Sequence, residues 1–205
     1  MATTPAAIVN SALELADSQA FVSGTLPTFD DSPAGVAAGW VYPIVRDFLL
    51  RLLDPEFARL GPLIADLSAA GAPLPPWSYE YYYPSDCVRL RQVRPQSVGS
   101  GVPGAQVDIW DPQPIRASVA YDQEGGGADP LVPRKVILTN QQDALIVYTT
   151  NSVSETFWDA DFVDAMIRRL AQPLAATISG RFDQARELLT ESERYASLAA
   201  ENRDL

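Results

Sequence analysis

The hydrophobic periodicity of this chain changes twice along its length, and this change constrains the fold more than any other feature. Up to about residue 70, apolar residues recur every three or four positions, which is typical of amphipathic helices. Between residues 77 and 150 they alternate with polar residues, which is typical of strands, and helical spacing returns at Ser152. We therefore expect an α+β fold: a helical bundle lobe from residues 1–75 and 151–205, with an inserted antiparallel β-rich lobe from residues 76–150.

Two sequence signals mark helix starts in the N-terminal region. Thr4-Pro5 and Ser32-Pro33 each place a hydroxyl N-cap before a proline that suits the first helical position. The second helix is expected over residues 33–53, where Pro43 predicts a kink or two shorter helices. It carries an apolar residue at every fourth position: Val36, Trp40, Ile44, Phe48 and Leu52. Residues 56–67 are expected to form a further short helix.

The β-rich region and the C-terminal helices follow from similar local patterns. Strands are expected at residues 88–93, 107–110, 117–121, 135–138 and 144–148. Residues 139–143, between the last two, predict a hairpin turn. Ser152 and Glu155 then form a capping box for a helix that Gly180 would end. Residues 181–205 are rich in helix-forming residues and predict a last helix.

Charge and composition exclude several classes of function. The chain has 205 residues, a net charge of −11, one lysine and no histidine. A sequence-independent DNA grip needs clustered lysine and arginine, so this balance argues against one. The commonest general base and metal ligand is absent. A single cysteine allows no intrachain disulfide and fits a reducing compartment. We also expect no signal peptide and no membrane helix.

Two acidic groups could carry chemistry, but each has a simpler structural explanation. Asp159, Asp161 and Asp164 could offer oxygen ligands to a cation. Their spacing lacks the glycine and distal glutamate of a calcium loop, and acidic residues are favoured in a first helical turn. Glu80 and Asp86 could act as the paired acid and base of glycoside cleavage, although the sequence does not define their separation. We expect structural roles for both groups.

The remaining motifs are also expected to be structural. Cys87 has no histidine to activate it as a nucleophile. The G-x-G-x-x-G match at residues 99–104 neither follows a strand nor opens a helix, so it fails as a nucleotide fingerprint. Arg89 and Arg91 could bind phosphate, but we expect them to form salt bridges. The tyrosines of residues 79–83 could stack on bases, but we expect them to pack in the core or an interface. We predict no catalytic, cofactor-binding or metal site.

One aromatic and acidic run carries a resemblance to a known family. Residues 77–89 read W-S-Y-E-Y-Y-Y-P-S-D-C-V-R, which resembles a signature of the tail tubular protein A and head-to-tail adaptor family of tailed phages. Residues 42–58, 137–151 and 158–180 resemble further blocks of that family in the same order. Asp54-Pro55 departs from the pattern, because the family usually has a tryptophan region there. The resemblance covers nearly the whole chain.

The resemblance implies a structural virion protein rather than an enzyme. Such an adaptor forms a ring of about twelve subunits beneath the portal protein, extends the DNA channel and offers a platform to a downstream tail or nozzle protein. It would be made in the host cytoplasm and reside in the neck or tail of the virion, without a membrane partner. Double-stranded DNA would pass through the lumen without specific binding, which an acidic wall favours.

The expected portal or ring interface lies in the last predicted helix. Its apolar residues are sparse and surrounded by polar ones, which predicts a docking element: Leu188, Leu189, Tyr195 and Leu198. Two alternatives stay open. The chain could be a virion-associated cell-wall hydrolase that uses Glu80 or Asp86 as its acid. It could also be a neck or connector subunit of a long-tailed phage or a gene-transfer particle.

Overall fold

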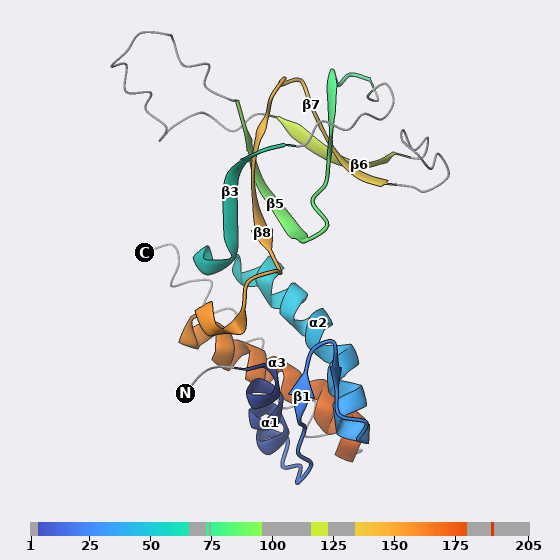
Figure 1. Ribbon diagram of the computed structural model, residues 1–205, viewed down its shortest axis with the longest axis vertical. Coiled ribbons are helices and arrows are strands. Elements are labelled where there is room, and N and C mark those ends of the chain that lie inside the picture. The colour runs from blue at the N-terminus through green and yellow to red at the C-terminus, as the bar shows by residue number, and fades with distance from the viewer. Residues whose placement is uncertain are drawn as a thin grey trace. The chain divides into compact units, whose positions relative to one another are not determined.

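The fold combines α-helices with antiparallel β-sheets, as the periodicity predicts (Figure 1). The computed structural model describes residues 4–65, 73, 75–95, 116–122, 134–179 and 190. Contacts divide the chain into two compact units. We call the described residues of 1–58 and 151–205 the helical unit, and those of 59–150 the β unit. The division differs from the predicted boundary at residue 75, because residues 59–64 belong with the strands.

The helix starts in the N-terminal region are those that the sequence predicts. Helix α1 spans Pro5–Leu15, and the Thr4 hydroxyl accepts a hydrogen bond from the Ala7 amide at 3.2 Å. Helix α2 spans Pro33–Leu53, and the Ser32 hydroxyl accepts from the Gly35 amide at 3.0 Å. Helix α2 runs without a break through Pro43, so the two shorter helices do not form.

Helix α3, Ala160–Ser179, packs against both α1 and α2, as Figure 1 shows. A short hairpin of β1 (Gly24–Thr25) and β2 (Thr28–Phe29) contacts the same two helices, β1 against α1 and β2 against α2. The ring of Tyr42 lies 6.2 Å from that of Phe29 and 6.5 Å from that of Trp158, centroid to centroid. An aromatic cluster therefore joins the hairpin, α2 and the start of α3.

The predicted helix start at Ser152 is wrong. The Ser154 hydroxyl accepts from the Thr156 amide and caps a 3₁₀ turn, η2, at Glu155–Phe157. Helix α3 begins only at Ala160, after Trp158 has packed into the aromatic cluster. Gly180 and, apart from residue 190, the predicted last helix lie outside the described residues.

The β unit consists of two three-stranded antiparallel sheets, with strand orders β3-β8-β5 and β4-β7-β6. The strands are β3 (Arg59–Ile64), β4 (Tyr79–Tyr82), β5 (Cys87–Arg94), β6 (Ala117–Asp122), β7 (Arg134–Thr139) and β8 (Leu145–Thr150). Side chains of both sheets form one buried core: Tyr81 and Ile137 of one sheet meet Val93, Ile146 and Tyr148 of the other. Because each sheet contributes buried side chains to it, this core holds the two sheets of the β unit together.

Two predictions about the β unit are wrong. Residues 59–64 form strand β3 rather than a helix, because they pair with β8. Residues 139–143 do not form a hairpin turn, because β7 pairs with β4 and β6 whereas β8 pairs with β3 and β5. This segment therefore carries the chain from one sheet to the other. The strand predicted at residues 107–110 lies outside the described residues.

Candidate interaction surface

Helix α2 is apolar on two faces, and only one of them is buried. The inward face contributes core residues to the helical unit, among them Ala38, Tyr42, Val45, Leu49 and Leu53. The outward face carries the residues that recur at every fourth position: Val36, Trp40, Ile44, Phe48 and Leu52. We call these five the α2 ridge. Trp40 is 75% exposed and Ile44 69%, and the other three are between 44% and 52% exposed.

The ridge is continuous because residues four apart are neighbours on a helix surface, with Cβ atoms about 5–6 Å apart. One charged group lies against the ridge: the guanidinium of Arg169, on α3, is 5.0 Å from the centre of the Phe48 ring. Contiguous apolar patches of more than a few hundred Å² are uncommon on monomers and mark contact surfaces. We therefore treat the α2 ridge as the candidate functional site.

A cavity of about 300 Å³ lies beside the N-terminal end of the ridge. Its walls come from the β1–β2 hairpin and from α2: Pro27, Thr28, Phe29, Asp30, Asp31, Gly35, Val36, Gly39 and Trp40. At Gly35 an added Cβ would collide with the backbone and side-chain oxygens of Asp30, so the close approach of hairpin and helix needs a glycine. The cavity extends the ridge with a hollow that another apolar side chain could fill.

Asp30 is the anionic group of this cavity. Hydrogen bonds from the Ser32 hydroxyl, and then from the Ser23 amide and hydroxyl, lower the pKa of Asp30 from 3.8 to about 2. The carboxylate is therefore charged at every physiological pH. Its bonds join the hairpin to the start of α2, which gives Asp30 a structural role.

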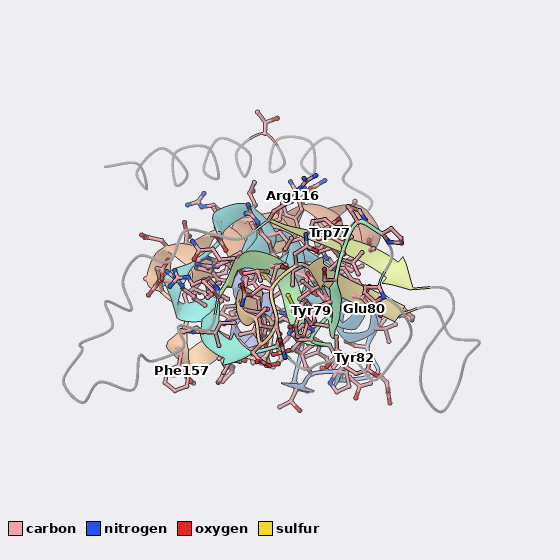
Figure 2. The ribbon with its side chains drawn as sticks, turned by 90° about the horizontal axis from the view of Figure 1, so that it is seen from above. Trp77, Tyr79, Glu80, Tyr82, Arg116 and Phe157 are labelled. Atoms are coloured by element: carbon pink, nitrogen blue, oxygen red, sulfur yellow. The ribbon has the colours of Figure 1, made fainter. Side chains whose placement is uncertain are left out.

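The proposed acid pair lies in the β unit, and both carboxylates are built into its sheets. The carboxylate of Asp86 accepts bonds from the Tyr148 hydroxyl at 3.2 Å and the Thr150 hydroxyl at 2.6 Å. Burial, followed by the charge of Asp86, raises the pKa of Tyr148 to about 12, so the hydroxyl stays a donor. Glu80 of β4, which is labelled in Figure 2, is 6% exposed. In the strand register it pairs with Leu138 of β7. This geometry favours structural roles for both.

The aromatic run holds the connection between the two sheets. The Tyr81 hydroxyl donates to the carbonyl of Gln141 at 2.8 Å and accepts from the Ala144 amide at 3.4 Å. Burial raises the pKa of Tyr81, whose side chain is only 1% exposed. Figure 2 shows the side chains of Trp77 and Arg116 beside one another, with the guanidinium 5.6 Å from the ring centre. These contacts account for the run as core and sheet structure rather than as a platform for bases.

Among the other predicted sites, Asp164 and Arg91 each bond to a neighbouring side chain within their own unit. Asp161 lies in the first turn of α3, and Asp164 accepts a bond from Arg168 at 2.9 Å. Within the described residues, no group of three or more histidine, cysteine, aspartate or glutamate side chains could hold a metal ion. Arg91 donates to the Thr149 hydroxyl at 2.9 Å.

The thiol of Cys87 is half-buried, and burial raises its pKa, which favours the less reactive protonated form. The glycine motif at residues 99–104 and the expected interface residues Leu188, Leu189, Tyr195 and Leu198 lie outside the described residues.

The chain matches no family model, and no curated protein is significantly similar to it. None of the helices in the described part of the chain is both long and apolar enough to cross a membrane.

The sequence shows the α2 ridge as a periodic pattern of apolar residues, but it does not show that this face is exposed. The available signal was that α2 has more large apolar residues than one buried face can hold.

Proposed function

We propose that this chain is a structural virion protein, the head-to-tail adaptor of a tailed phage. In this role its copies form a ring of about twelve beneath the portal protein. The ring extends the DNA channel and presents a platform to the next tail or nozzle protein. The observation that carries the proposal is the exposed α2 ridge, because a row of five large apolar side chains needs a protein surface to cover it.

Three other features support the proposal. The four sequence blocks around residues 42–58, 77–89, 137–151 and 158–180 resemble the adaptor family in its order. The division into helices from both ends of the chain and a β unit is compatible with the helical bundle and β domain that the family has. A net charge of −11 suits a conduit wall that repels phosphate.

The test is reconstitution with the cognate portal. The purified chain is mixed with portal rings, and the product is imaged by electron microscopy. We expect an added ring with the axial symmetry of the portal-bound adaptor, located in the neck of assembled virions. A chain that binds neither the isolated portal nor virions lacking their tails would contradict the proposal.

A wall-turbidity assay tests the hydrolase alternative separately. We expect no lysis by the wild-type chain, since Asp86 is bonded within the sheet and Glu80 is buried. Lysis that Glu80→Gln abolishes, without a change in melting temperature, would contradict the structural assignment of the aromatic run.

A further inference from the structure

The exposed area of the α2 ridge is a substantial part of what a contact between two proteins requires. A fully buried aromatic side chain removes about 150–250 Å² from water, so the exposed fractions of Trp40 and Phe48 amount to roughly 200–300 Å². The exposed parts of Val36, Ile44 and Leu52 add aliphatic area to this. A standard protein–protein interface removes about 800 Å² from each partner.

The charge of the ridge indicates what kind of partner fits it. The five residues are uncharged, in a chain whose net charge is −11. Two copies of such a chain repel one another, so they can meet closely only along a surface that places no charge opposite a like charge. The ridge is such a surface. A partner chosen by opposite charge would instead be met by acidic side chains, and the ridge carries none.

The shape of the helix surface also fits a second copy. Residues at every fourth position form one of the ridges along which helices interdigitate. The adjacent row, one residue earlier, contains Gly39, which faces the Pro27 carbonyl oxygen of the hairpin, then the partly exposed Pro43, and then the charged Asp47 and Arg51. Only Pro43, beside Ile44, therefore offers a low and uncharged surface next to the ridge. Two ridges related by a two-fold rotation can therefore cross closely at Ile44, where the neighbouring surface is low.

We infer that two copies of this chain form a two-fold symmetric dimer in which the α2 ridges cross and pack against one another. Ile44, at the middle of the ridge, lies close to the two-fold axis, and Trp40 of each copy packs beside the ridge of its partner. This dimer does not depend on the proposed function. If the chain is an adaptor, the dimer covers the ridge until assembly requires it.

Molecular mass in solution tests the dimer. We expect light scattering and sedimentation to give a dimer for the wild-type chain at tens of micromolar, dissociating to a monomer on dilution. Trp40→Glu should give a monomer throughout the same range, because it would bury a charge without a partner against the apolar ridge of the second copy. Phe157→Glu is the matched control: Phe157, in η2, is 71% exposed and lies off the ridge, so this variant should remain a dimer.

A crosslink tests the register without relying on a disruptive change. In a Cys87→Ser background, Ile44→Cys should form an intermolecular disulfide in high yield on mild oxidation, whereas Phe157→Cys should not. A wild-type chain that stays monomeric at every concentration would overturn the inference. So would a dimer that survives Trp40→Glu, or equal crosslinking at residues 44 and 157. None of these outcomes bears on portal binding, which the reconstitution measures by itself.

Discussion

The two units of this chain use large aromatic residues in opposite ways. In the β unit Tyr81 is buried, and its hydroxyl bonds to the segment that joins the two sheets. In the helical unit Trp40 is one of the most exposed side chains, although it lies on a helix whose other face is core. The aromatic run that stands out in the sequence is therefore internal structure, whereas the less conspicuous ridge of α2 is the surface.

This difference shows that residue type and spacing do not by themselves identify a contact surface. An aromatic side chain stabilises whichever environment removes it from water. In the β unit the second sheet provides that environment within the chain. On the outward face of α2 nothing in the described part of the helical unit does, and we propose that a second copy provides it. Substitutions at buried positions should therefore affect the folding of one unit strongly, and substitutions on the α2 ridge should affect it little.

Removing the buried ring should damage the β unit most. We expect Tyr81→Ala to lower the free energy of unfolding by about 3–5 kcal/mol, because it leaves a cavity and frees the bonds to Gln141 and Ala144. Hydrogen exchange separates the units: amides of β8 should lose protection while those of α3 keep theirs. Tyr82→Ala, at a half-buried ring, is the control and should cost less. Equal losses in both units would contradict the division.

A change at the start of α2 should damage the helical unit instead. Gly35→Ala places a methyl group against the carbonyl and carboxylate oxygens of Asp30, so we expect a loss of about 1–3 kcal/mol in the free energy of unfolding. In hydrogen exchange, α2 and α3 should lose protection and β8 should not. Gly39→Ala is the control. The added Cβ would lie 3.2 Å from its nearest neighbour, the Pro27 carbonyl oxygen, so the loss of stability should be smaller. A neutral Gly35→Ala would show that the hairpin moves away freely.

Acid should weaken the helical unit through Asp30. The pKa of Asp30 is about 2 in the folded chain and near 3.8 when unfolded, so the unfolded form takes up a proton first as the pH falls. The stabilisation is complete above the unfolded value and is lost between about pH 4 and pH 2. Thermal melts across this range should show a flatter pH dependence for Asp30→Asn than for the wild-type chain. Identical slopes would mean that the bonds from Ser23 and Ser32 contribute nothing.

Changes on the ridge should leave the folded monomer almost unaffected. Trp40→Glu removes a side chain that is mostly in water, so we expect the free energy of unfolding to change by less than about 0.5 kcal/mol. The measurement is chemical unfolding at concentrations low enough for the wild-type chain to be a monomer. A loss as large as that of Tyr81→Ala would show that the ridge is covered within the chain, which would remove the basis for the dimer.

Local signals were sufficient for some elements and insufficient for others. The capped starts of α1 and α2 were predictable because Thr4-Pro5 and Ser32-Pro33 satisfy backbone amides a few residues away. Strand β3 was not, because residues 59–64 are held by pairing with β8, far along the chain. The connection at residues 139–143 resembles a hairpin turn locally, and only the second sheet shows that the flanking strands separate.

The helical ends and β-rich middle of the chain, the caps of two helices and the acidic charge follow from the amino-acid sequence, because periodicity, capping and charge are local or additive properties. Which apolar face of α2 is core depends instead on long-range packing. Both faces are apolar enough to be buried, and α3 with the β1–β2 hairpin covers the one that carries Tyr42 and Leu49. The ridge of Trp40 and Ile44 remains exposed because burial depends on which surfaces meet, and no single helix encodes its neighbours.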